Sequence, residues 1–192
     1  MQTYAQDVID YAEQLSARPV LIGHSMGGLV ISEAADRRPE LFSMLIYLTA
    51  LVPPPGQISV RDLPGVSEKM VAAITSGLEI SPDGTGAFPR ETARDVFYNH
   101  CAADVQDAAL ARLSRQPLGA GIGAINTTRE GLGSVRKHYI ECLDDQALPM
   151  DSQRAMQSNA EFRSIHALAS DHSPFFSMPA ELARLIAKIA EE

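Results

Sequence analysis

Residues 19–30 join a short run of branched apolar residues to a glycine-rich turn and then, at once, to an apolar helical pattern. The run Val20-Leu21-Ile22 predicts a strand, and the pattern that starts at Leu29 predicts a helix. Only Gly23-His24-Ser25-Met26-Gly27 lies between the two, so the chain has to change direction within a few residues. A turn this sharp predicts that Ser25, at its apex, has a sparsely populated backbone conformation.

The glycines on either side of Ser25 follow from the tightness of the turn. Side chains two positions before and after the apex would collide, so Gly23 and Gly27 are predicted to be the positions that need glycine. The turn would place Ser25 at the start of a helix, whose amide dipoles favour developing negative charge. This is the context of a nucleophile elbow. A chance match of Gly-x-Ser-x-Gly in an ordinary strand–helix turn is the alternative.

Several other segments have the pattern of a parallel sheet with helices on both faces. Strand patterns recur at 42–52, 134–142 and 163–169, and the first of these is a continuous apolar run. An amphipathic helix is expected at 3–17, and a last helix is expected to begin near Pro179. The predicted fold class is α/β, with a single domain over residues 1–192 and a mostly parallel sheet flanked by helices.

The segment at about 53–132 has a different character, because glycine and proline clusters interrupt it. Short helical patterns lie between these clusters, at 66–74, 90–98 and 102–113. The segment is too long for a loop, and its interruptions argue against a second sheet. We therefore expect a helical cap inserted between strands of the main sheet.

Two polar segments follow the later strands and offer partners for a reactive serine. Asp144 and Asp145 come directly after the third predicted strand, and His172 follows the fourth. Parallel strands end at one edge of a sheet, so these groups and Ser25 are expected to meet there. The order Ser25, Asp145, His172 is the chain order of hydrolases with a nucleophile elbow. Taken singly, an aspartate after a strand is more often a helix cap or turn former, and a loop histidine is more often solvated.

The composition argues against several classes of function. A formal net charge of −8 and a pI near 5.1 leave no basic surface for nucleic acid. No apolar run approaches the roughly 20 residues that cross a bilayer, and the first residues lack the pattern of a signal peptide. Cys101 and Cys142 lack metal-ligand spacing and are expected to be reduced thiols in a cytoplasmic protein.

Five short segments of the sequence together match a family pattern. They are Gly23-His24-Ser25-Met26-Gly27-Gly28, Tyr98-Asn99-His100-Cys101, Arg115-Gln116-Pro117-Leu118, Tyr139-Ile140-Glu141-Cys142 and Asp171-His172-Ser173-Pro174-Phe175-Phe176. With these segments the chain resembles the α/β-hydrolase branch of plant methylesterases, hydroxynitrile lyases and bacterial pyrethroid-type carboxylesterases. The resemblance covers nearly the whole chain.

The resemblance implies a carboxylic ester hydrolase that works through an acyl-enzyme. It implies that Ser25 is the nucleophile, that His172 is the general base and then acid, and that Asp145 orients His172. Asp171 is interpreted as structural. The implied mechanism needs no metal and no organic cofactor, and the implied partner is a small ester.

Other site residues are assigned less directly. Asp145 is preferred to Asp144 because its place relative to the residues that follow matches the family pattern, and Asp144 stays as the alternative. The backbone N–H of Met26 is expected to donate to the oxyanion. His24 and Phe175 are expected to line the substrate pocket, and simple core packing explains them equally well.

The chain departs from the family pattern at its start. Family members have strands before the elbow, one of which ends in a His-Gly loop with a second oxyanion donor, and roughly the first third has no counterpart here. Losing one donor typically lowers turnover by about 10²–10³-fold. We therefore expect a shortened reading frame or fragment, impaired catalysis, and an exposed elbow strand that favours a homodimer.

Two other functions fit the same residues. A hydroxynitrile lyase would have, by resemblance, a lysine directly after the catalytic histidine, but this chain has Ser173 there, so an esterase is favoured. A non-catalytic protein that keeps the pocket for a small ester or acid is the second alternative.

Overall fold

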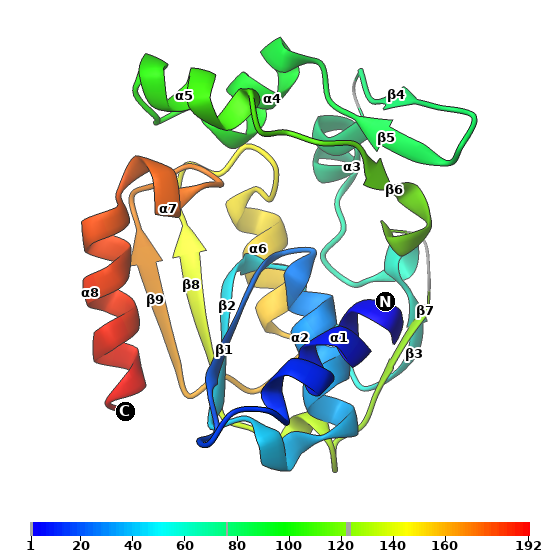
Figure 1. Cartoon of the computed structure of the whole chain (residues 1–192), viewed down its shortest axis with the longest axis vertical. Coiled ribbons are helices and arrows are strands. Elements are labelled where there is room, and N and C mark those ends of the chain that lie inside the picture. Colours follow the sequence, from blue (N-terminus) through cyan, green and yellow to red (C-terminus); the bar gives the residue numbers. More distant parts are fainter. Residues whose placement is uncertain (1, 76, 122–123) are drawn as a thin grey trace.

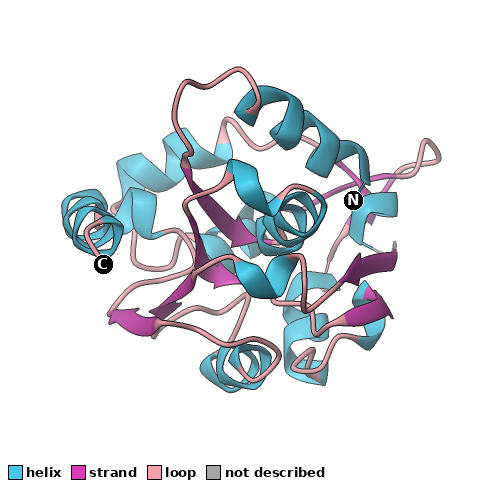
Figure 2. Cartoon of the chain, turned by 90° about the horizontal axis from the view of Figure 1, so that it is seen from below, coloured by secondary structure: helices cyan, strands magenta, loops and turns pink. Residues whose placement is uncertain are grey.

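The computed structural model describes residues 2–75, 77–121 and 124–192. Its main sheet contains four parallel strands in the order β1-β2-β8-β9 (Figure 1). These strands are β1 (Val20–Ser25), β2 (Met44–Ala50), β8 (Lys137–Cys142) and β9 (Ser164–Leu168). Helices surround the sheet in the view of Figure 2, so the predicted α/β class with a parallel sheet is confirmed.

Helices cover both faces of the sheet. They are α1 (Gln2–Ala12), α2 (Gly27–Arg37), α6 (Met150–Gln157) and α8 (Pro179–Ala190), and the short helix α7 (Pro174–Ser177) directly precedes α8. Alternate residues of β2 face opposite sides: Tyr47 packs in a cluster with Leu29 of α2, and Ile46 packs in another with Ile189 of α8. Every residue of β2 is buried, which explains why this strand has a continuous apolar sequence.

Two helices differ from their sequence predictions. The helix expected at 3–17 ends at Ala12, since Ala12 is the last buried position of its apolar stripe and Leu15 is 40% exposed. Helix α6 has a largely polar sequence without a wide apolar face, and for that reason the pattern did not predict it. Among the described residues, no helix is long and apolar enough to cross a membrane.

The segment between β2 and β8 contains both helices and short strands. Its helices are α3 (Glu68–Thr75), α4 (Arg90–Phe97) and α5 (Ala103–Leu110). Its strands are β3 (Gly56–Ser59), β4 (Glu79–Ile80), β5 (Thr85–Ala87), β6 (Gln116–Pro117) and β7 (Ala124–Thr127). They form two small antiparallel sheets, β3-β7 and β4-β5-β6, so the expectation that this segment lacks a sheet is wrong. Strands of two to four residues are too short to show an alternating pattern.

This segment lies over the carboxyl ends of the main strands. Figure 1 shows α4 and α5 on the side toward which β8 and β9 point. Residues 76 and 122–123, which fall within the predicted cap, lie outside the described residues.

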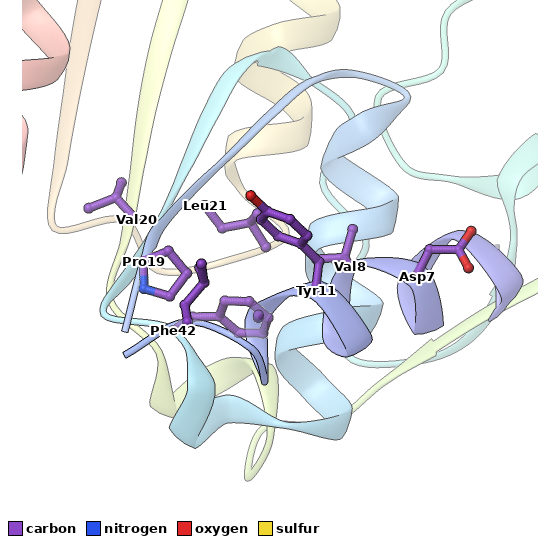
Figure 3. A pocket seen from close by; sticks show the side chains of 9 residues that line it. Asp7, Val8, Tyr11, Pro19, Val20, Leu21 and Phe42 are labelled. Carbon is purple, nitrogen blue, oxygen red and sulfur yellow. The ribbon is translucent and has the colours of Figure 1, made fainter. Parts of the chain in front are cut away.

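Strand β1 forms an open edge of the sheet. It pairs with β2 on one side, and no other described strand pairs with it, so the predicted exposure of the elbow strand is confirmed. Ile22, in the middle of β1, is 39% exposed. A pocket of about 390 Å³ lies between α1 and the start of β1, where Figure 3 shows Val8, Tyr11 and Leu21 among its lining side chains. This pocket lies at the opposite end of the strand from Ser25.

Candidate active site

Strand β1 passes into α2 through a strained turn. Ser25 has a φ of 54°, in the left-handed region that side chains other than glycine rarely adopt. The backbone N–H of Leu51, just after β2, donates to the Ser25 carbonyl oxygen at 3.0 Å. Ser25 therefore has the rare backbone conformation that the Gly-x-Ser-x-Gly pattern predicts.

The glycines that this turn needs are only partly those that the motif predicts. A Cβ atom at Gly23 would lie 2.8 Å from the Gly27 carbonyl oxygen, so glycine is required there. A Cβ atom at Gly27 would meet nothing within 4 Å, so the prediction for Gly27 is wrong. The tight position is Gly28, where a Cβ atom would lie 2.2 Å from the Leu51 carbonyl oxygen. Glycine is needed there because the first turn of α2 packs directly against the backbone that follows β2.

Asp145 and His172 meet at the carboxyl ends of β8 and β9. The Nδ1 atom of His172 lies 2.7 Å from Oδ2 of Asp145, and both residues are buried. Because a carboxylate oxygen accepts, this geometry places a proton on Nδ1 and directs it at Asp145. Asp144 is exposed, and its carboxylate lies 3.8 Å from Nε2 of His100 in the segment above. The structure therefore brings His172 together with Asp145 and not with Asp144.

The Asp145 carboxylate has further donors that the sequence analysis did not identify. Its Oδ1 accepts the backbone N–H groups of Ala147 at 2.7 Å and Leu148 at 2.8 Å. Its Oδ2 accepts the hydroxyl of Thr49 as well as Nδ1 of His172. Four donors compensate the cost of burying this charged group. Thr49 resembles any other strand residue in the sequence, yet its φ of 36° marks it as an outlier for a β-branched residue.

Ser25 and His172 are connected through His24. Within the described ranges no hydrogen bond joins the Ser25 hydroxyl to His172. His24, the neighbour of Ser25, has its Nε2 atom 2.7 Å from the backbone carbonyl oxygen of His172. The two imidazole rings lie 4.5 Å apart between their centres. Burial, and then the nearby His172, lower the pKa of His24 to about 3, so its ring is neutral at ordinary pH.

Phe175 and Phe97 pack near the rings of His24 and His172, and Met26 directly follows Ser25. Phe175 of α7 is 39% exposed and packs edge-on against His24 at 5.0 Å. Phe97 of α4 lies 5.5 Å from the His172 ring, between ring centres. The N–H of Met26, just before α2, has no hydrogen-bond partner in the described part of the chain. Contact of His24 and Phe175 with a substrate stays a prediction.

Asp171 connects the segment above the site to the loop that carries His172. It is fully buried, and its Oδ2 accepts the backbone N–H of His100 at 3.0 Å and the thiol of Cys101 at 3.5 Å. Burial, and then Asp171, raise the pKa of the Cys101 thiol to about 12, so the thiol stays protonated and donates. The other oxygen, Oδ1, accepts bonds from its own loop, namely from Ser170, Ser173 and Ser177.

The described residues contain no cluster of three or more histidine, cysteine, aspartate or glutamate side chains arranged to hold a metal ion. The two cysteines, Cys101 and Cys142, are both free and buried.

The chain matches a family and several relatives of known sequence. The sequence pattern of the alpha/beta hydrolase family matches residues 2–185. A pyrethroid hydrolase from Sphingobium wenxiniae is 31% identical over 199 residues, which cover 100% of this chain and 70% of that protein. A chloroplastic member of the Arabidopsis thaliana methylesterase series, number 14, is 30% identical over 207 residues. The match covers 100% of this chain but only 58% of that relative.

The same likeness holds in three dimensions. The crystal structure of a pyrethroid hydrolase from Sphingobium faniae superposes with a TM-score of 0.84 at 29% sequence identity. The superposition covers 98% of this chain and 76% of that one. The parallel sheet with its flanking helices is therefore the fold of these hydrolases, and the chain spans part of their length.

Proposed function

Because this chain belongs to the alpha/beta hydrolase family, we propose that it is a serine hydrolase that cleaves small carboxylic esters. Its relatives are of the esterase type, including methylesterases and pyrethroid hydrolases. The observation that supports the proposal best is the buried Asp145–His172 pair beside the strained turn at Ser25. An imidazole held by a carboxylate is what a serine hydroxyl needs to become nucleophilic near neutral pH.

The proposed reaction proceeds through an acyl-enzyme. The Ser25 hydroxyl attacks the ester carbonyl carbon while Nε2 of His172 removes its proton. Asp145 holds the other ring nitrogen and stabilises the imidazolium that forms. His172 then donates this proton to the departing alcohol, and a water molecule repeats the sequence to release the acid. The hydrogen bond between a nucleophile and its base is often long before substrate binds, so its absence in the resting structure fits this mechanism.

The oxyanion would be stabilised by the backbone of the elbow. In this proposal, the N–H of Met26, which directly precedes α2, and the amide end of that helix would stabilise the developing negative charge. The family's second donor, on a His-Gly loop before the elbow, has no counterpart among the described residues.

We also propose that the segment at about 53–132 acts as a cap over this site. Phe97 from this segment lies against His172, and Gln116 reaches the Met26 sulfur at 3.6 Å. Together with His24 and Phe175, these side chains would wall a small pocket for the acyl or alcohol group.

Self-association is proposed along the open edge of β1. An edge strand with unpaired N–H and C=O groups and an exposed Ile22 can pair with the same strand of a second copy. We propose a homodimer on this basis.

The test of the proposed function is labelling with a fluorophosphonate probe followed by mass mapping, together with hydrolysis of p-nitrophenyl acetate. We expect the probe to label Ser25 and hydrolysis to be lost in S25A. D145N should lower kcat by up to about 10⁴-fold, because the imidazole tautomer is no longer fixed. D144N, at the neighbouring exposed position, is the matched control and should not change kcat. Equal hydrolysis by the wild-type protein and S25A would contradict the enzyme assignment.

A further inference from the structure

His24 joins β1, which carries Ser25, to the loop that carries His172. It is the residue before Ser25 in β1, and its Nε2 atom lies 2.7 Å from the backbone carbonyl oxygen of His172. A carbonyl oxygen only accepts, so the hydrogen bond requires a proton on Nε2 of His24. The ring therefore has one defined neutral tautomer, with Nε2 as the donor.

The surroundings of His24 keep this donor uncharged. Burial and the adjacent His172 disfavour the imidazolium, while the hydrogen bond to the His172 carbonyl and then Asp145 act in the opposite direction without outweighing them. A neutral His24 adds no positive charge next to the imidazolium that His172 forms during the proposed reaction. It can therefore hold His172 without opposing the proton transfer.

Among the described residues, the other hydrogen bonds that hold His172 and its neighbour Ser173 come from the segments after β8 and β9. Asp145 follows β8 and holds the ring, while Asp171 holds the backbone N–H of Ser173, the next residue. Neither contact involves β1. The bond from His24 starts one residue away from Ser25, so it fixes the histidine loop relative to the nucleophile.

We propose that His24 is a positioning residue that sets the separation between the Ser25 hydroxyl and the His172 imidazole through its Nε2–H bond. The proposal rests on the proposed function, because it assigns His24 to the same reaction. Its packing against Phe175 is a separate contact that does not require the donor.

Two substitutions separate the donor from the rest of the side chain. H24Q places an amide N–H close to the position of Nε2, whereas H24N has the same amide on a chain one methylene shorter, which does not reach the His172 carbonyl. We expect H24N to lower kcat about 10–100-fold with KM within about threefold, because a 1 Å displacement of a catalytic group can cost about 10² in rate. H24Q should recover most of this loss. The rate of Ser25 labelling by a fluorophosphonate should follow the same order.

A structural role alone would give a different result. The imidazole proton between His172 and Asp145 gives a downfield NMR signal, which reports whether the pair is intact in each variant. Equal kcat values for H24N and H24Q, with that signal present in both, would overturn the proposal. If H24N does not fold, H24F provides the same comparison with H24Q, because phenylalanine keeps the ring contact with Phe175 but has no donor. Absence of labelling at Ser25 in the wild-type protein would instead reject the proposed function, so the two failures are distinguishable.

Discussion

Each oxygen of the Asp145 carboxylate has two donors, and this division fixes the orientation of His172. Oδ1 is held by the backbone N–H groups of Ala147 and Leu148, so the carboxylate is tied to the turn that follows β8. Oδ2 is left for the Thr49 hydroxyl and for Nδ1 of His172. With its proton on Nδ1, the imidazole keeps Nε2 as the basic nitrogen. The backbone around Asp145 therefore determines which nitrogen can accept a proton.

The low pKa of His24 predicts that the stability of the folded chain depends on pH. Its pKa is lowered from 6.5 to about 3 in the folded chain, so between these values the unfolded chain binds more protons. Stability from this residue is complete above pH 6.5 and falls as the pH decreases toward 3, by roughly 1.4 kcal/mol per pH unit. Urea unfolding of the wild-type protein and H24Q between pH 6 and pH 4 measures this effect. H24Q should lose less stability across that range, and parallel curves would contradict the prediction.

Alanine at the two adjacent glycines of the elbow, Gly27 and Gly28, should change the free energy of unfolding in opposite directions. G28A should lower the free energy of unfolding by about 3 kcal/mol, since its Cβ would overlap the Leu51 carbonyl oxygen and force α2 away. G27A has open space at the first position of α2 and should be neutral or stabilising by up to about 1 kcal/mol. Denaturant unfolding of the two variants, which add the same methyl group, gives the comparison. A larger loss of stability in G27A than in G28A would contradict this account of the packing around the elbow.

Single residues were predictable where a backbone rule applies to them. Ser25 follows from its place between a strand and a helix, and its φ of 54° agrees with that rule. The need for glycine at position 28 was not predictable, because it depends on a carbonyl after β2 that is distant in the sequence. Thr49 and the bond from His24 were missed for the same reason. Both depend on which backbone lies opposite, and a residue pattern does not contain that information.

At the scale of elements, the turn between α4 and α5 holds both loops that carry the proposed catalytic groups. Asn99 donates from Nδ2 to the Asp144 carbonyl oxygen at 3.3 Å, on the loop after β8. The N–H of His100 donates to Asp171, on the loop after β9. The segment above the site is therefore bonded to the sheet next to Asp145 and next to His172.

Removing the charge of Asp171 should loosen this connection. D171N replaces an acceptor oxygen by an NH₂ group that faces donors, so we expect the free energy of unfolding to fall by about 3 kcal/mol. D104N changes an exposed aspartate on α5 in the same way and should stay within about 0.5 kcal/mol of the wild-type protein. Urea unfolding measures both variants. Similar stabilities of D171N and D104N would contradict the role given to Asp171.

The longer elements were largely predictable from their patterns, and the short ones were not. A continuous apolar run predicted β2, because this strand is buried on both faces. The small sheet of β3 and β7 pairs segments that are far apart in the chain, Gly56–Ser59 with Ala124–Thr127. Such strands are stabilised by pairing with distant backbone, and four residues carry too little periodicity to indicate it.

For the molecule as a whole, the two edges of the main sheet have different surroundings. The β1 edge adjoins the pocket of about 390 Å³ next to α1, and Tyr11 on that helix is 68% exposed. The β9 edge is the other end of the sheet, and it also has an exposed residue, Ile165, at 49%. The β1 edge thus combines unpaired backbone with an adjacent apolar pocket.

A charge on β1 should reduce self-association. I22K places an ammonium group on the open edge, where it opposes pairing with a second copy, so we expect a monomer at concentrations at which the wild-type protein is a dimer. I165K introduces the same charge on β9 and should leave the dimer intact. Light scattering after size-exclusion chromatography gives the mass of each protein. A wild-type monomer, or loss of the dimer in I165K alone, would contradict association through β1.

The hydrogen bonds of Asp171 have a consequence for the range of esters that the proposed enzyme accepts. The Asp171 carboxylate binds both the turn between α4 and α5 and the loop that carries His172. A displacement of the turn therefore also affects the loop. A bulky ester that pushes this turn outward has to break the bonds to His100 and Cys101, and the loop then loses part of its support. We therefore expect large esters to be poor substrates of the proposed enzyme for two reasons: they fit poorly, and they weaken the support of the loop that carries His172.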